Sequence, residues 1–260
     1  MNLNLNNKYA LVCGSTAGIG KATAISLALE GTKVTLLARN EEKLKAVLKE
    51  LPDSAKHDYI IADFSNPEVL EEKISAYVKT HHGFHILVNN TGGPAGGPIF
   101  SAKLSEFETA FTQHLKCNHV LVQALVPFMK ETGYGRIINV ISTSVKQPLD
   151  GLGVSNTIRG AVANWSKTLA NELGQFGITV NNVLPGATGT ERLTEIIKNK
   201  SAKTGISEDA ATEAMKQAVP AKRFAKPEEL AHAITFLASD CASYINGINL
   251  PVDGGRTKSL

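Results

Sequence analysis

The stretch that decides the fold of this 260-residue chain reads Gly14-Ser15-Thr16-Ala17-Gly18-Ile19-Gly20. It follows an apolar run, Tyr9 to Cys13, and precedes a stretch with helical character from Lys21 to Glu30. Gly14 permits a tight turn, and at Gly18 and Gly20 the missing side chains leave room for a phosphate group and for helix packing. Because amide N–H groups at a helix start attract anions, the turn predicts a pyrophosphate-binding site.

The glycine spacing separates this turn from two better-known motifs. It departs from the strict G-x-G-x-x-G pattern. It also misses the P-loop, because Ala22 follows Lys21 where a hydroxyl is needed for Mg²⁺. A tight turn without a ligand is the alternative, but the position between strand and helix at the start of the chain favours a dinucleotide site.

The end of the second predicted strand, Lys33 to Ala38, bears on the choice of cofactor. Arg39 lies 19 residues after Gly20, where the dinucleotide fingerprint places the residue that meets the ribose 2′ position. An acidic residue there would bind the 2′-hydroxyl of NAD, whereas an arginine suits a 2′-phosphate. Arg39 therefore predicts NADP(H); a solvated residue at a helix start is the alternative.

Short apolar runs alternate with amphipathic stretches along the whole chain. Further strands are expected at Tyr59–Ala62, His85–Asn90, Arg136–Ile141, Ile178–Leu184 and near Ile248. Further helices are expected at Glu41–Leu51, after an Asn66 cap, from a Ser105/Glu108 capping box to Lys130, at Gly160–Leu173 and after Pro227. This alternation predicts an α/β fold, namely a single-domain doubly wound parallel sheet (a Rossmann fold) over residues 1–260 with helices on both faces.

Charge and cysteine content exclude several classes of protein. The net charge is +3 and the basic residues are scattered, which disfavours a nucleic-acid partner. The three cysteines lie far apart, which disfavours a zinc site or a disulfide framework. The cluster His81, His82 and His85 lacks helical ligand spacing, so no metal is expected there.

With neither a signal peptide nor a membrane-length apolar run, a cytoplasmic location is expected.

Taken together, the motifs resemble the short-chain dehydrogenase/reductase family, above all its 3-oxoacyl-acyl-carrier-protein reductase branch. Asn89-Asn90-Thr91-Gly92 is similar to the family's N-N-A-G motif, and Pro185-Gly186 to its P-G motif. The resemblance implies a homotetramer or homodimer. It also implies cofactor contacts from Gly14, Ser15, Thr16, Gly18, Ile19, Gly20, Arg39, Asp63, Phe64, Asn90, Gly92, Pro185, Gly186 and Thr190.

At the catalytic positions the chain departs from the family pattern. The resemblance implies hydride transfer to or from a carbonyl or alcohol carbon, with a Tyr and a Lys in a Y-x-x-x-K motif, a Ser and an Asn. Ser142 matches the serine, but Ser155 stands at the Tyr position and Arg159 at the Lys position. His114 stands at the Asn position. The sequence therefore predicts a degenerate catalytic motif.

These replacements change the expected chemistry. The Ser155 hydroxyl is a poor general acid, whereas Arg159 stays charged and could hold the nicotinamide ribose or stabilise an alkoxide. His114 has an ordinary pKa near neutrality, so we hypothesise that it replaces the Tyr as proton donor through a water and Ser155. A packed helix histidine is the alternative. Lys146 either faces the site or is solvated, and Tyr134 is expected at the opposite end of the sheet.

Two further segments border the expected site. The run from Gly92 to Pro98 is either a loop beside the substrate or an irregular surface loop. The resemblance makes residues 191–222 the substrate lid, here called the lid; they carry Arg192, Lys198, Lys200 and Lys203, which leaves an anionic or carrier-bound substrate open. The sequence thus predicts an NADP(H)-dependent oxidoreductase acting on a small-molecule or acyl-thioester carbonyl with an atypical proton donor; the alternative is a non-catalytic NADP(H)-binding protein.

Overall fold

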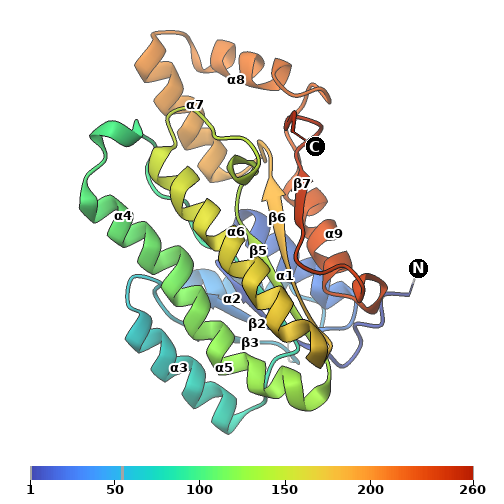
Figure 1. Ribbon diagram of the computed structural model, residues 1–260. Coiled ribbons are helices and arrows are strands. Elements are labelled where there is room, and N and C mark those ends of the chain that lie inside the picture. The colour runs from blue at the N-terminus through green and yellow to red at the C-terminus, as the bar shows by residue number, and fades with distance from the viewer. Residues whose placement is uncertain (1, 54–55, 260) are drawn as a thin grey trace.

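A seven-stranded parallel sheet in the order β3-β2-β1-β4-β5-β6-β7 forms the centre of the computed structural model, which describes residues 2–53 and 56–259 (Figure 1). The strands are β1 (Tyr9–Cys13), β2 (Lys33–Ala38), β3 (Asp58–Ile61), β4 (Ile86–Asn89), β5 (Gly135–Val140), β6 (Ile178–Pro185) and β7 (Asn249–Val252). The strand order reverses between β1 and β4, and open α/β sheets bind ligands at that switch point.

Burial on both faces explains why these strands could be located from the sequence. The residues of β4 and β5 are all buried, as are all but the first of β1. Such strands are continuous apolar runs without alternation. Every predicted strand is present, with ends shifted by at most one residue, and all pairings are parallel. The predicted doubly wound parallel sheet is confirmed.

Helices cover both faces of the sheet and bury two separate cores. They are α1 (Gly18–Leu29), α2 (Glu41–Glu50), α3 (Pro67–Thr80), α4 (Leu104–Phe111), α5 (Cys117–Thr132), α6 (Gly153–Leu173), α7 (Glu191–Thr204), α8 (Glu208–Gln217) and α9 (Pro227–Leu237). One core packs α1, α2 and α9 against the sheet, and the other packs α3, α5 and α6 against its opposite face (Figure 1).

Three predicted helix starts are wrong. α1 begins at Gly18, so its first amides belong to the glycine turn. α6 begins at Gly153, seven residues before the predicted Gly160, because Val154 and Ile158 pack against Ala110. The Ser105/Glu108 capping box does not form. Instead, the Glu106 carboxylate accepts from the backbone N–H of Lys103 at 2.7 Å, and α4 begins at Leu104.

The long helix predicted to run to Lys130 is interrupted. A π-helical turn, Thr112–Lys116, separates α4 from α5. In such a turn one extra residue is inserted into the helix, and the insertion redirects the side chains beside it. His114 lies in this turn and is buried.

Four asparagines lie side by side across half of the sheet. Asn89, Asn139, Asn182 and Asn249 are register partners on β4, β5, β6 and β7. The Asn89 amide donates to Asn139 at 2.8 Å, Asn139 donates to Asn182 at 3.0 Å, and Asn182 donates to Asn249 at 2.9 Å. Side-chain amides thus form a continuous asparagine ladder that runs from the last residue of β4 to the first residue of β7.

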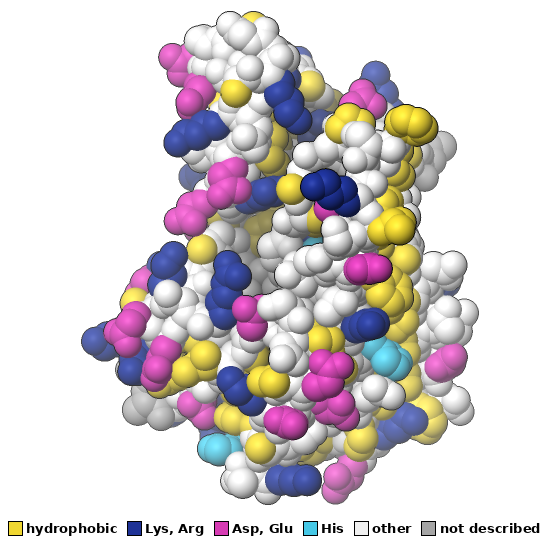
Figure 2. All heavy atoms as spheres, turned by 90° about the vertical axis from the view of Figure 1, so that its left-hand side faces the viewer, with side chains coloured by type: hydrophobic (Ala, Val, Ile, Leu, Met, Phe, Trp, Pro, Cys, Tyr) yellow, Lys and Arg dark blue, Asp and Glu magenta, His cyan; other side chains and the backbone are white. Residues whose placement is uncertain are grey.

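The lid contains α7 and α8, which form a lobe beyond the carboxyl ends of the strands (Figure 1). Figure 2 shows this side of the molecule hollowed beneath that lobe. None of the helices in residues 2–53 and 56–259 is long and apolar enough to cross a membrane.

Candidate functional site

The glycine turn is packed directly against the end of β4. Gly14 has a φ of +58°, and a Cβ there would lie 2.5 Å from the carbonyl oxygen of Asn90. A Cβ at Gly20 would lie 2.2 Å from the carbonyl oxygen of Gly14. The Asn90 side-chain amide donates to the carbonyls of Cys13 and Gly14, both at 3.3 Å. The turn therefore tolerates no side chain and is fixed to the switch point.

The first turn of α1 meets the start of the lid. A Cβ at Gly18, which has a φ of +52°, would lie 3.0 Å from the Thr190 methyl group. Thr190 is the residue before α7 and follows the Pro185-Gly186 segment at the end of β6. Ser15 is buried with its hydroxyl 3.5 Å from the Leu37 carbonyl, while Thr16 and Ile19 are partly exposed. The predicted phosphate-binding residues are therefore together at one edge of the sheet.

Arg39 and Asp63 are exposed where β2 and β3 end. The Ser65 hydroxyl and backbone N–H bond to the Asp63 carboxylate at 2.6 and 2.9 Å, and these bonds lower its pKa. The positive charge of Arg39 lowers that pKa further. Phe64 follows, and its carbonyl accepts from the Cys117 thiol at 3.1 Å. Gly92 lies farther along, exposed in the loop after β4.

Two predicted catalytic residues meet at the carboxyl end of β5. The guanidinium Nη1 of Arg159, on α6, donates to the Val140 carbonyl at 3.1 Å. Ser142 follows two residues later, and its hydroxyl oxygen accepts from the Ser144 N–H at 3.1 Å. Ser155 precedes Arg159 by four residues on α6, which places both on the same helix face. Arg159 is buried, whereas Ser142 and Ser155 are partly exposed.

His114 contacts a residue that the sequence did not connect with it. Its Nδ1 is hydrogen-bonded to the Thr91 hydroxyl, and its Nε2 is buried without a partner in the part of the chain that the structure describes. The side chain is 1% exposed. Burial lowers the imidazole pKa to about 2, helped by the positive charge of Arg159. His114 is therefore neutral at pH 7 and lies close enough to Arg159 to be affected by its charge.

The neutral, buried state of His114 predicts a loss of stability in acid. Its pKa is about 2 when folded and near 6.5 when exposed, so the unfolded chain binds an extra proton below pH 6.5. The favourable contribution is complete above pH 6.5 and falls by about 1.4 kcal/mol per pH unit below it. His85, with a pKa lowered by burial to about 4, adds a similar loss that ends near pH 4.

We expect a His114→Asn variant to lose about 2–3 kcal/mol less unfolding free energy between pH 6.5 and 4.5 than the unmodified protein. Urea unfolding at a series of pH values measures this difference. The His85→Asn variant is the matched comparison. Equal acid losses in the His114→Asn variant and the unmodified protein would contradict a neutral His114.

The tyrosines lie away from the carboxyl end of β5. The Tyr134 hydroxyl donates to the Ala238 carbonyl at 2.7 Å, at the opposite end of the sheet as predicted. The remaining tyrosines, Tyr9, Tyr59, Tyr77 and Tyr244, lie at the start of β1, in β3, in α3 and in the loop before β7. The five tyrosines thus belong to other parts of the fold than Ser142 and the start of α6.

The histidine cluster (His81, His82 and His85) and Lys146 contact residues other than Ser142, Ser155, Arg159 and His114. The His85 Nδ1 accepts from the Tyr9 N–H at 3.1 Å, and the His82 ring stacks on the Tyr9 ring at 3.9 Å. His81 stacks on Tyr77. These rings form an aromatic cluster at the start of β1 and β4. Lys146 is partly buried in the loop after β5, where its carbonyl accepts from the Ser259 hydroxyl at 3.5 Å.

The loop from Gly92 to Pro98 is tied to two helices. The Gly97 N–H donates to the Gly151 carbonyl at 2.7 Å, and the Gly153 N–H donates back to the Gly97 carbonyl at 3.1 Å. From the lid, Arg192 Nη2 donates to the Pro94 carbonyl at 2.7 Å. The loop is thus held by the start of α6 and by the lid, while Gly92, Ala95, Gly96 and Pro98 remain exposed. The sequence indicates both the Gly92–Pro98 loop and the lid, but no feature of it predicts that they are in contact.

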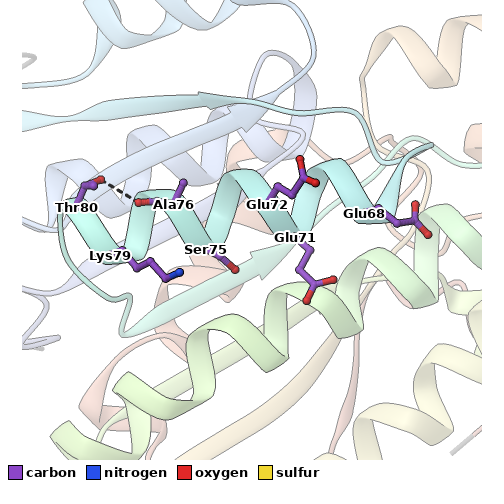
Figure 3. A pocket seen from close by; sticks show the side chains of 7 residues that line it. All are labelled: Glu68, Glu71, Glu72, Ser75, Ala76, Lys79 and Thr80. Carbon is purple, nitrogen blue, oxygen red and sulfur yellow. Dashed lines mark hydrogen bonds between the residues drawn. The ribbon is translucent and has the colours of Figure 1, made fainter.

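A separate depression of about 650 Å³ lies along α3 (Figure 3). It is lined by Glu68, Glu71, Glu72, Ser75, Ala76, Lys79 and Thr80. The carboxylates point in different directions from one helix instead of converging (Figure 3). The depression includes no residue of the glycine turn or of the strand ends, so it is not the candidate site.

Comparisons with known proteins identify the family of this chain. A family model described as enoyl-(acyl carrier protein) reductase matches residues 14–257. The 3-oxoacyl-[acyl-carrier-protein] reductase FabG of Vibrio cholerae is 34% identical over 255 residues, which are 97% of this chain and 98% of that protein. The NADPH-dependent reductase BacG of Bacillus subtilis is 29% identical over 261 residues, 98% of this chain and 100% of that protein.

A solved structure extends the likeness to three dimensions. L-sorbose reductase from Gluconobacter frateurii, complexed with NADPH and L-sorbose, has a TM-score of 0.92, 31% identity and full coverage of both chains. The glycine turn, the switch point and the strand-end residues lie within the matched region. The chain belongs to the short-chain dehydrogenase/reductase family.

Proposed function

We propose that this protein is an NADP(H)-dependent oxidoreductase that transfers hydride to or from a carbonyl or alcohol carbon of a small molecule or acyl thioester. The observation that carries the proposal is the glycine turn at the switch point. At Gly14 and Gly20 a side chain would collide with backbone, and the turn opens a helix whose first amides face an incoming anion. The NADPH-dependent relatives of the same fold support this assignment.

The residues of the site fit the two halves of NADP(H). Gly14, Gly18 and the first amides of α1 would hold the pyrophosphate, and Arg39 would pair with the 2′-phosphate. Asp63 would contact the adenine and Thr190 the carboxamide, as the family resemblance implies. The bound cofactor supplies a hydride from C4 of its nicotinamide ring.

Ser142 and Arg159 would hold the substrate oxygen. Both lie at the carboxyl end of β5, and Arg159 uses one of its five N–H donors on the Val140 carbonyl. Because the guanidinium is buried and charged, its remaining donors would stabilise negative charge that develops on the oxygen. We place Ser155 and Arg159 at the positions of the family's Tyr and Lys.

The proton would come from neutral His114. At a pKa near 2 the imidazolium is absent at pH 7, so the donor is the ring N–H itself. In this relay His114 gives its Nε2 proton to the alkoxide, through a water and Ser155, and takes a proton at Nδ1 from the Thr91 hydroxyl. Thr91 is partly exposed and recovers its proton from solvent. The imidazole is then neutral with its proton on Nδ1, and it regains the starting tautomer after product release, when Nε2 takes a proton from water and the Nδ1 proton leaves through Thr91 to solvent.

The test is NADPH oxidation by the purified protein over a panel of ketones and 3-oxoacyl thioesters. We expect turnover above the protein-free rate, with NADPH favoured over NADH. The His114→Ala variant should lose about 10²-fold or more in kcat while its Kd for NADPH, measured by fluorescence, stays unchanged. Thr91→Val should lower kcat in the same direction with less disturbance of packing.

His232→Ala is the matched control, because His232 is exposed on α9 and should leave kcat unchanged. An unchanged kcat in both the His114→Ala and the Thr91→Val variants would remove His114 from the mechanism. NADPH binding without turnover across the whole panel would favour the alternative, a non-catalytic NADP(H)-binding protein of the same fold.

We also propose that the chain forms a homodimer or homotetramer. Phe100, Leu104 and Ile99 are 101%, 80% and 54% exposed. They belong to the start of α4 and the segment before it, and apolar side chains gather along one edge of the face shown in Figure 2. Exposed apolar surface of this kind is typical of an interface between subunits.

A further inference from the structure

Two arginines from different elements face the same site. Arg159 projects from α6 to the end of β5, where its Nη1 meets the Val140 carbonyl at 3.1 Å. Arg192 projects from the first turn of α7, and its Nη2 meets the Pro94 carbonyl at 2.7 Å. The loop after β4 and the strand end of β5 are neighbours in the sheet. One guanidinium thus binds a carbonyl at the end of β5, and the other binds a carbonyl in the loop after the neighbouring strand β4.

The positive charge of Arg192 acts on Arg159. The pKa of Arg159 is lowered to about 10 by burial and then by the positive charge of Arg192. No carboxylate acts on it in the opposite direction. The arginines that form ion pairs in residues 2–53 and 56–259 are Arg136, Arg192 and Arg223, so Arg159 has no carboxylate partner within that part of the chain.

Arg192 itself is only weakly neutralised. Its Nη1 lies 3.4 Å from Glu195, one turn along α7, and both side chains are substantially exposed. Exposed pairs of this type contribute little. The site therefore combines a buried unpaired cation with a second, partly exposed one.

A buried polar atom at the site lacks a partner. The His114 Nε2 is buried and unpaired among the described residues, and the ring is neutral. Buried polar atoms in folded proteins are satisfied by protein, water or ligand. A buried, uncompensated guanidinium is unfavourable in the same way. An anion with several acceptor oxygens would satisfy Arg159, Arg192 and His114 together.

We propose that the substrate is an oxo acid, whose carboxylate is bound by Arg192 while its carbonyl oxygen lies toward Arg159. The inference rests on the proposed reductase function. The planar fork of a guanidinium matches a carboxylate in a bidentate manner. Reduction converts the oxo acid and NADPH, with one proton, into the hydroxy acid and NADP⁺. Arg192 acts here as a specificity-determining residue and takes no proton.

The test compares 2- and 3-oxo acids with their neutral methyl esters. In the unmodified protein the ratio of kcat/KM for acid over ester should be about 10- to 100-fold. Arg192→Gln should reduce this ratio to within a few-fold by lowering kcat/KM for the acids alone. Arg223→Gln is the matched control, because Arg223 is exposed and pairs with Glu229 away from the site. It should keep the ratio.

A second readout does not depend on turnover. Oxamate, an unreactive analogue of a 2-oxo acid, and its methyl ester are titrated into the NADPH-loaded protein while the fluorescence of bound NADPH is followed. Oxamate should bind more tightly than the ester, and Arg192→Gln should abolish that preference. Oxamate binding of this kind without any turnover would support the anion site while the reductase assignment fails.

Other outcomes overturn the inference. Turnover of esters and acids at equal kcat/KM, unaffected by Arg192→Gln, would leave a reductase without an anion site. A weaker Kd for NADPH in Arg192→Gln with an unchanged acid-to-ester ratio would place the guanidinium on the cofactor. Absence of both turnover and oxamate binding would remove both proposals.

Discussion

A Gly20→Ala variant is expected to lose NADPH affinity by about 100-fold or more. The added Cβ would lie 2.2 Å from the Gly14 carbonyl oxygen and 2.8 Å from its carbon, and both are backbone atoms that move only with the turn. A displaced turn loses hydrogen bonds from its amides to the pyrophosphate. Two such bonds to a charged group, at about 1.5–3 kcal/mol each, correspond to roughly 100-fold or more in Kd.

The matched control is Gly160→Ala. Gly160 lies inside α6, and a Cβ there has nothing within 4 Å. This variant should keep its NADPH affinity and gain up to about 1 kcal/mol in unfolding free energy, because glycine is a poor helix former. Fluorescence titration with NADPH and urea unfolding measure the two quantities. Equal affinities in Gly20→Ala and the unmodified protein would place the cofactor elsewhere.

An Arg159→Met variant is expected to lose about 10²- to 10³-fold in kcat/KM, since it removes donors aimed at the substrate oxygen. The stability of the fold, by contrast, should not fall. Arg159 is 7% exposed without a carboxylate partner among the described residues, and an apolar side chain of similar length in such a place is neutral or stabilising. We expect an unchanged or higher Tm.

The Arg159→Lys variant distinguishes the effect of the positive charge from that of the guanidinium shape. It should keep more activity than Arg159→Met, because it retains a cation beside the Val140 carbonyl. Steady-state kinetics and thermal unfolding on the three proteins test both parts. A fall in Tm as large as that of a core truncation would mean that Arg159 holds the structure together and has no separate role in the chemistry.

The fold was largely predictable from the sequence because its strands are buried on both faces. β1, β4 and β5 stand out as apolar runs between glycine and polar residues, and the alternation with helices leaves one topology. The start of α6 was not predictable. Ser155, Asn156 and Thr157 disfavour a helix interior, and burial of Val154 and Ile158 against α4 overrides that local preference.

The sequence points to candidate residues for the site but not to the contacts between them. Ser142, Arg159 and His114 were identified by their positions, and the structure brings them to one edge of the sheet. The Thr91–His114 hydrogen bond depends on the π-helical turn, which leaves no periodicity in the sequence. Its only trace is that Thr91 departs from the alanine of the family motif. The Arg192–Pro94 contact joins segments 98 residues apart.

The asparagine ladder has a consequence for the distance between the two reactants. Asn89 immediately precedes Asn90, which holds the glycine turn, and Asn139 and Asn182 lie three residues before Ser142 and Pro185. A slip of one residue between any two of these strands would break the amide contacts and reverse the facing of every side chain. The ladder therefore fixes the strand register that would set the distance between the hydride donor and the hydride acceptor.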